Sequence, residues 1–278
     1  MTGAESPFAW RRWSLVIIGG AIVGTLLICA IFASVIAPYS PYDLDVAAML
    51  HGSSAAHWLG TDELGRDVLS RTIHAAQISM KVAFIAATIG LVFGTLIGVV
   101  AAYFGGWVDL VLMRFMELLF SFPAILLAVV LMASLGTSIL NAMLAIGIVF
   151  IPGFSRLARA QTEVVLREQY VESARALGMS HGRIVFREIL PNILAPLLVE
   201  AAAAFSYAIL LESALSFLGL GAQPPDPSWG NMLSTGRGFM SQAPWLSIVP
   251  GMTIFLSVLG FNLIGDGLRD LLDPHLKE

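Results

Sequence analysis

Two acidic residues inside apolar segments are the first candidates for chemistry. Glu200 lies within a long apolar run, one helical turn after Pro196, and Glu212 lies near the end of the same run. A charge in a membrane-spanning segment is costly, so such a residue is a functional candidate by default. We predict that Glu200 faces a water-filled path or pairs with another subunit, and that Glu212 lies close to an external gate.

Other kinds of chemistry are not supported by the sequence. No glycine is followed by lysine, so the phosphate loop Gly-x-x-x-x-Gly-Lys-Ser/Thr is absent. The five histidines lack zinc-type spacing, and no Ser/His/Asp constellation is readable. The single cysteine, Cys29, excludes an internal disulfide. We therefore expect no catalytic residue, metal or cofactor on this chain, and any ATP and Mg must be bound by partner chains.

The composition indicates a membrane protein. Of 278 residues, 57% are hydrophobic and 12% charged, whereas about a quarter are charged in an ordinary soluble domain. The net charge of -4 leaves no broad basic surface for nucleic acid. Membrane lipid is the expected surrounding, and nucleic acid is not an expected partner.

The apolar runs predict an all-α protein with six transmembrane helices. A crossing needs about 20 apolar residues, because backbone polar groups must be satisfied internally. The predicted crossings are residues 14–37, residues 82–104, two short spans within 118–155 that turn at 136–138, residues 193–211 and residues 245–265. The first run is longer than the core of a secretory signal, so we expect it to be retained.

Lysine and arginine positions set the predicted orientation, because short cytoplasmic loops are enriched in them. With the N-terminus inside, eleven of the 15 basic residues fall on the cytoplasmic side, six of them in the loop 155–191. Both termini are then cytoplasmic. The predicted parts are a cytoplasmic segment 1–13, a first helix 14–37, an external loop 38–79, a five-helix core 80–266 containing the loop 155–191, and a cytoplasmic tail 267–278.

Two local patterns concern packing. Gly90, Gly94 and Gly98 recur every fourth residue, which predicts a smooth strip for close contact with another helix, and not a site. In the external loop, Thr61 or Asp62 is expected to cap a short helix whose apolar face includes Leu64 and Val68. The alternative for this loop is an amphipathic connector without ligand contact.

The loop 155–191 predicts two short helices. Val171, Ala174 and Leu177 or Gly178 recur at helical spacing, and Glu172 is expected to pair with Arg175. Gly178 ends this helix, and a second one runs from Ser180 until Pro191 begins the next span. A solvated basic loop is the alternative reading.

This loop resembles the EAA loop of binding-protein-dependent ABC importer permeases, in which Glu-Ala-Ala, three residues, Gly, nine residues, Ile, one residue and Leu-Pro follow one another. Serine replaces the first alanine, and Glu188 stands where the pattern has isoleucine. The resemblance implies a coupling helix seated in a cytoplasmic ATPase. The implied coupling residues are Tyr170, Glu172, Ser173, Ala174, Arg175, Gly178, Leu190 and Pro191.

Further stretches at 64–71, 212–221 and 224–230 look like the second permease subunit of the dipeptide/oligopeptide/nickel family. The resemblance implies a type I ABC importer fold in the bacterial inner membrane. Its implied partners are a second permease subunit, two ABC ATPases and an external solute-binding protein, which Pro224, Pro225 and Trp229 are expected to contact.

Peptides are the substrate that the resemblance favours, while nickel and other small solutes stay open. A secondary transporter should show inverted repeats and paired intramembrane charges, and neither is visible. A membrane enzyme should show clustered polar residues, which are also missing.

Overall fold

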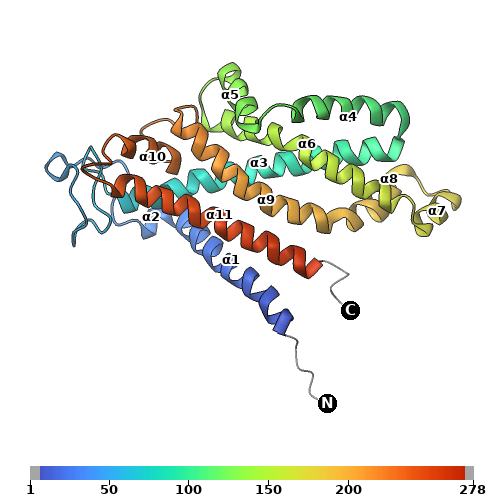
Figure 1. Ribbon diagram of the computed structural model, residues 1–278, viewed down its shortest axis with the longest axis horizontal. Coiled ribbons are helices and arrows are strands. Elements are labelled where there is room, and N and C mark those ends of the chain that lie inside the picture. Colours follow the sequence, from blue (N-terminus) through green and yellow to red (C-terminus); the bar gives the residue numbers. More distant parts are fainter. Residues whose placement is uncertain (1–6, 273–278) are drawn as a thin grey trace, which may run out of the picture.

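The computed structural model describes residues 7–272, with side chains described for 13–271. These residues are nearly all helical, and within them the only β-type pairing is an isolated bridge between Thr61 and Asp67. The elements (Figure 1) are α1 (Pro7–Ile31), α2 (Ala33–Ile36), a 3-10 turn (Val46–Ala48), α3 (Val68–Phe104), α4 (Gly106–Phe120), α5 (Ala124–Leu135), α6 (Ile139–Val165), α7 (Gln169–Ala176), α8 (His181–Ile184), a π-helical turn (Val185–Ile189), α9 (Leu190–Phe217), α10 (Trp229–Arg237) and α11 (Trp245–Leu272).

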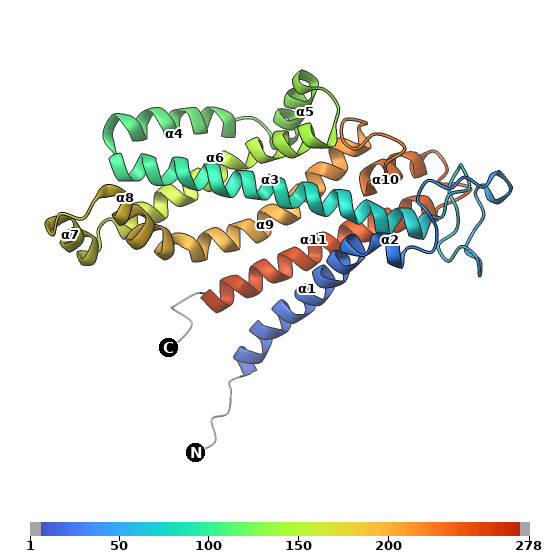
Figure 2. The same cartoon turned by 180° about the vertical axis from the view of Figure 1, so that it is seen from behind.

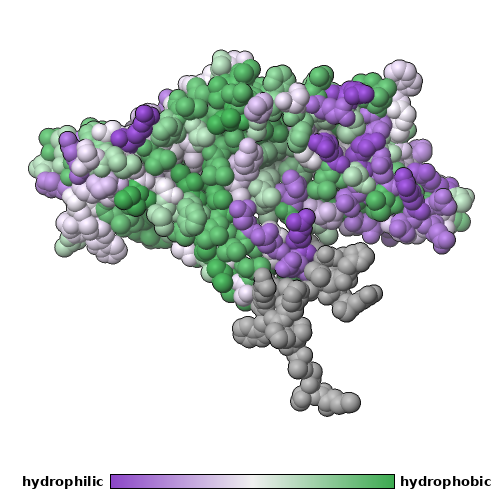
Figure 3. Space-filling view, viewed as in Figure 1, coloured by the Kyte–Doolittle hydropathy of each residue, from purple (hydrophilic) through white to green (hydrophobic). Residues whose placement is uncertain are grey.

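The predicted membrane-spanning character is confirmed. Among the described residues, five helices are long and apolar enough to cross a bilayer, and the bent pair α4–α5 makes a sixth crossing if it counts as one span. Hydrophobic surface covers the middle of the molecule, while hydrophilic surface gathers toward the end that carries α7 and α8 (Figure 3). An apolar surface of this kind, on the face shown, is what a lipid-embedded bundle requires.

The third crossing differs from the prediction. We expected two short spans within 118–155, but α4 already begins at Gly106 and a break at Pro123 turns α5 by 93°. Proline has no backbone N–H to donate into the preceding turn, so the helix stops there and α5 starts in a new direction. The predicted turn at 136–138 is confirmed, since Gly136 ends α5 and Ser138 caps α6.

The second crossing is longer than predicted. Helix α3 begins at Val68, capped by Asp67, whose side chain accepts a hydrogen bond from the backbone N–H of Ser70. The prediction of a helix that starts at Thr61 or Asp62 is wrong, because residues 61–67 form a loop. Part of the predicted external loop is therefore the first turns of α3.

The glycine strip on α3 packs against α6, as predicted. A Cβ at Gly94 would lie 2.5 Å from the Cβ of Phe154 and 2.7 Å from the backbone oxygen of Ile151. A Cβ at Gly98 would collide with the backbone oxygen of Ser155. The two backbones thus approach to a distance that only glycine permits.

The first helix packs at the edge of the bundle against α11 (Figure 2). A Cβ at Gly19 would lie 2.7 Å from the backbone oxygen of Gly260, so this contact also depends on small residues. The beginning of α1 and the end of α11 both point away from the loop 38–67 and toward the half that contains α7 (Figure 1).

Replacing Gly94 tests the α3–α6 contact. We expect Gly94→Val to destabilise the protein by about 1–3 kcal/mol or more, because overpacked side chains force the helices apart. The melting temperature and the monodisperse fraction of the purified protein measure this effect. Gly24→Val is the control, since a Cβ at Gly24 meets no atom within 4 Å; equal melting temperatures for the two variants would contradict the close contact.

Candidate functional site

An ion-pair network holds the loop between α2 and α3 in place. The carboxylate of Asp62 accepts a hydrogen bond from Nε of Arg66 at 2.7 Å and forms an ion pair with Nε of Arg71 at 3.3 Å. All three side chains are at least nine-tenths buried. Arg66 also contacts Glu63 at 2.9 Å, and Arg71 donates to the backbone oxygen of Pro41 at 3.0 Å. The loop is thereby fixed across residues far apart in sequence.

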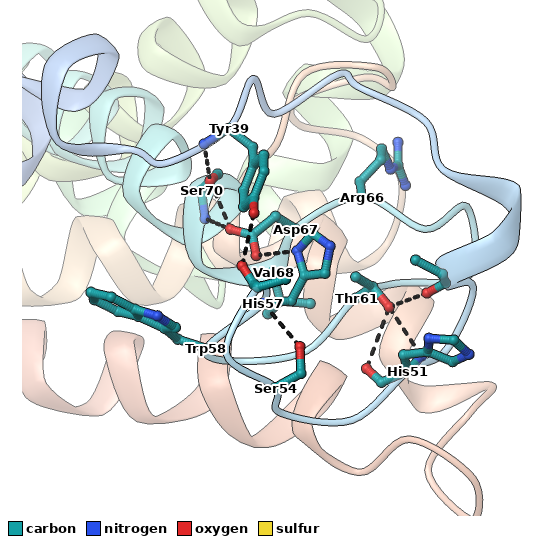
Figure 4. A network of polar contacts seen from close by, with 12 residues as sticks. Tyr39, His51, Ser54, His57, Trp58, Thr61, Arg66, Asp67, Val68 and Ser70 are labelled. Carbon is teal, nitrogen blue, oxygen red and sulfur yellow. Dashed lines mark hydrogen bonds and ion pairs between the residues drawn. The ribbon is translucent and has the colours of Figure 1, made fainter.

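A second network surrounds the start of α3 (Figure 4). Asp67 lies 3.0 Å from Nδ1 of His57 and accepts the hydroxyl of Ser70 at 2.7 Å, while the backbone N–H of Tyr39 donates to that hydroxyl oxygen. Trp245 at the beginning of α11 donates its Nε1–H to the backbone oxygen of Thr61 at 3.2 Å. The loop therefore joins the ends of α3 and α11.

The loop also contacts the segment between α9 and α10. The hydroxyl of Tyr42 donates to Oδ1 of Asp226 at 2.8 Å. This hydrogen bond raises the pKa of Tyr42 above its ordinary value.

The three residues expected to contact the binding protein differ in exposure. Pro224 and Pro225 are exposed beside Tyr42 and Asp226. Trp229 is not available for such a contact, because its side chain is 0% exposed and its Nε1–H donates to the backbone oxygen of Thr72 at 3.1 Å. Its role is to fasten α10 to α3, which corrects the prediction for Trp229.

Glu212 occupies a closed position within the chain. Its carboxylate accepts hydrogen bonds from Ser79 at 3.0 Å and Ser216 at 2.7 Å, and the residue is 1% exposed. It joins α9 to α3 in the bundle interior. This enclosure does not favour the gate role predicted for it.

The residues of the EAA-like loop form an elbow, defined here as residues 169–189. Val171 and Ala174 are buried as expected, whereas Leu177 is 86% exposed and not part of the buried face. Gly178 has φ +75°, and the N–H of Met179 donates to the backbone oxygen of Ala174 at 3.0 Å. The predicted glycine stop is confirmed, since a residue in this left-handed conformation ends a helix.

The elbow is attached to α3 by aromatic and polar contacts. The hydroxyl of Tyr103 lies 2.7 Å from Nδ1 of His181, and the guanidinium of Arg175 stands 5.4 Å from the centre of the Tyr103 ring. The ion pair expected between Glu172 and Arg175 is not formed among the described residues. Arg175 instead contacts the ring of Tyr103. Tyr170, Glu172 and Ser173 are exposed.

The second half of the elbow continues into α9. Ser180 precedes α8, and Pro191 occupies the first turn of α9, as predicted. The helix is unbroken across Leu190, with a π-helical turn before it. Ile189 is 0% exposed and Glu188 half-buried, so the neighbouring isoleucine fills the apolar position at which this sequence departs from the family pattern.

Glu200 lines an open cavity of about 790 Å³ between α4, α6 and α9. Its other charged lining residues are Asp109, Arg114, Glu117, Arg156 and Arg159. Arg159 binds Asp109 through two contacts of 2.5 and 2.7 Å, which fasten α6 to the first turns of α4. The position of Glu200 is consistent with the predicted path.

Comparison with known proteins decides the family. Residues 94–278 match the family described as binding-protein-dependent transport system inner membrane component, and residues 8–52 match the N-terminal TM domain of oligopeptide transport permease C. The chain belongs to this permease family. It is a multi-pass membrane permease of an ABC importer, and the resemblance stated from residues 170–191 is confirmed.

Several curated relatives align with almost the whole permease. The dipeptide transport system permease protein DppC of Alkalihalophilus pseudofirmus is 47% identical, covering 96% of this chain and 88% of the relative. The di/tripeptide transport system permease protein DppC of Pseudomonas aeruginosa is 44% identical, covering 97% of this chain and 90% of the relative. The glutathione transport system permease protein GsiD of Pectobacterium atrosepticum is 42% identical over 96% and 90%.

A solved structure supports the fold of the permease. The crystal structure of an amino acid ABC transporter with histidines superposes with a TM-score of 0.51 at 17% identity, covering 69% of this chain and 90% of that one. At this identity the likeness concerns the fold alone.

Sequence reasoning missed several residues of the site. Tyr103 and His181 lie 78 positions apart, and no local pattern pairs them. The sequence predicts Arg156 to be a basic residue of the loop 155–191, because the predicted fourth span ends at residue 155. Its position in α6, which continues to Val165, places it on the cavity wall. Segments free of Asp, Glu, Lys and Arg predict the membrane spans. This criterion fails where a span carries charged residues that line a cavity.

Two neighbouring acidic residues test the ion-pair network between α2 and α3. We expect Asp62→Asn to destabilise the permease by about 3–5 kcal/mol, because it leaves two buried arginines without their shared carboxylate. Glu63→Gln should cost about 0–1 kcal/mol, since Glu63 is more exposed and, within residues 13–271, forms an ion pair with Arg66 alone. Limited proteolysis of the loop 38–67 measures both effects; equal resistance of the two variants would contradict the central position of Asp62.

Proposed function

We propose that this permease imports short peptides, as one of two different permease subunits in a complex with two ABC ATPases and an external solute-binding protein. The observation that supports a peptide substrate is the 47% identity, across 96% of the chain, to a dipeptide permease. A di/tripeptide permease and a glutathione permease among the relatives extend the expected range to tripeptides.

The elbow 169–189 is the proposed docking element for an ATPase. Leu177 and Phe186 are 86% and 74% exposed, so the elbow offers two large apolar side chains to a protein partner. Glu172, Ser173 and Arg175 are exposed beside them, and Leu190 and Pro191 lead from the elbow into α9. ATP and Mg are then held by the partner ATPases, and this chain supplies the lever.

The placement of charged residues supports an orientation with the elbow and both termini in the cytoplasm. The elbow region carries Arg167, Arg175, Arg183 and Arg187, which agrees with the enrichment of basic residues on the cytoplasmic side. The loop 38–67 lies at the opposite end (Figure 1). The segment between α9 and α10, which carries the exposed Pro224 and Pro225, contacts this loop through the hydrogen bond from Tyr42 to Asp226. That end is the proposed surface for the binding protein.

Uptake by the reconstituted complex tests the proposed function. Vesicles containing the two permeases and the ATPases, supplied with the binding protein, should accumulate labelled di- and tripeptides when ATP is present on the elbow side. Nickel and glutathione serve as competing solutes in the same assay. Accumulation of nickel with no uptake of peptides would contradict the proposed substrate.

Two glycines of the elbow give a matched test of coupling. An added Cβ meets nothing within 4 Å at Gly178 or Gly182, but only Gly178 has φ +75°. We expect Gly178→Ala to cost about 1 kcal/mol locally and to lower the amount of ATPase that co-purifies, while Gly182→Ala has little effect.

The stronger variant Gly178→Pro should abolish ATPase recruitment, because proline fixes φ near −65°. A Gly178→Pro complex that still holds the ATPases and couples hydrolysis to uptake would contradict the docking role.

A further inference from the structure

Two neighbouring cavities meet at three residues of α4, α6 and α9. The polar cavity of about 790 Å³ and a second cavity of about 390 Å³ share Phe120, Gly153 and Glu200 in their walls. The second cavity lies between α5, α6 and α9 and is lined mainly by apolar and aromatic side chains, among them Phe150 and Tyr207. A polar and an apolar compartment thus adjoin within the spans.

Only some charges of the polar cavity are neutralised by other side chains among residues 13–271. Arg159 binds Asp109 and, at 2.9 Å, Glu163, while Arg114 and Glu117 pair with each other at 3.0 Å. These contacts account for the charges contributed by α4 and for one arginine of α6.

Arg156 and Glu200 form no ion pair and no side-chain hydrogen bond within residues 13–271. The guanidinium of Arg156 lies 4.8 Å from the centre of the Phe120 ring, a contact that does not neutralise its charge. Two oppositely charged side chains without ionic partners, Arg156 of α6 and Glu200 of α9, therefore line the same cavity. Both belong to helices that are long and apolar enough to cross a membrane. Such charges are expensive in a membrane unless a ligand or a partner meets them.

We propose that Arg156 and Glu200 form a transit subsite for the two charged ends of a short peptide, and that the adjoining apolar cavity receives its side chain. The proposal rests on the proposed peptide import and assigns the residues of this chain that meet the solute in the membrane. Glu200 accepts hydrogen bonds from the peptide ammonium group, and Arg156 donates in a two-point contact to its carboxylate.

Gly153 stands where the two cavities join. A Cβ added there meets no atom within 4 Å, so a larger side chain extends into open space without displacing the backbone. This position therefore offers a steric probe of the subsite that leaves both charges intact.

Ligand binding to the permease–ATPase complex in nanodiscs, without the binding protein, tests the subsite. Saturation-transfer NMR detects weak binding and compares alanyl-phenylalanine with its N-acetylated and C-amidated forms. The free dipeptide should bind about tenfold more tightly than either blocked form, because each block removes a charge-assisted hydrogen bond. Glu200→Gln should abolish the preference for the free amino terminus, and Arg156→Gln the preference for the free carboxylate.

The controls separate this subsite from other roles. Glu163→Gln lies on α6 but outside both cavity walls, and it should leave the affinities for the free, N-acetylated and C-amidated dipeptides unchanged. Gly153→Leu should weaken the binding of all three dipeptides. Equal binding of free and blocked peptides to the unmodified complex would overturn the proposal, even where vesicle uptake confirms peptide import. Loss of the second permease from the purified Glu200→Gln or Arg156→Gln complex would also overturn it, because the charges would then serve subunit pairing.

Discussion

Everything in this permease depends on the contact between α3 and α6, in which glycines allow two long helices to touch along their backbones. In a bilayer no hydrophobic force drives helices together, so close packing must supply the association. At Gly94 and Gly98 any side chain would meet the backbone of α6. Because α3 has 37 residues, or about 55 Å at 1.5 Å per residue, this one pair sets the frame from one membrane face to the other.

The two ends of α3 carry the two regions assigned to partners. At its beginning, Asp67 caps the helix and contacts His57 of the loop 38–67, while the Nε1–H of Trp229 on α10 donates to the backbone oxygen of Thr72. At its other end, Tyr103 contacts His181 and Arg175 of the elbow. A displacement of the elbow by an ATPase would therefore act on α3 directly and on α9 through the continuous helix after Ser180. The Glu200 cavity lies beside this continuous helix, which links movement of the elbow to the proposed path.

Features encoded by neighbouring residues could be predicted from the sequence. The glycine strip, the stop at Gly178 and the start of α9 at Pro191 each have a local cause in backbone conformation, so their patterns are readable without a structure. Contacts between distant segments could not be predicted. Trp229 looked like an exposed aromatic residue after a proline-rich turn, but tertiary contact with α3 buries it. The bend at Pro123 was visible as a proline, yet the 93° change of direction depends on how α5 packs against α6.

The central claim, a lever on the cytoplasmic side joined by α3 to an outer loop, is tested most directly by labelling single cysteines in intact cells. In a Cys29→Ala background, Leu177→Cys and Trp58→Cys place thiols at positions that are 86% and 69% exposed. A membrane-impermeant maleimide should label the Trp58→Cys protein in intact cells. It should label the Leu177→Cys protein only after permeabilisation, and less when the ATPases are bound. Labelling of the Leu177→Cys protein in intact cells would contradict the account.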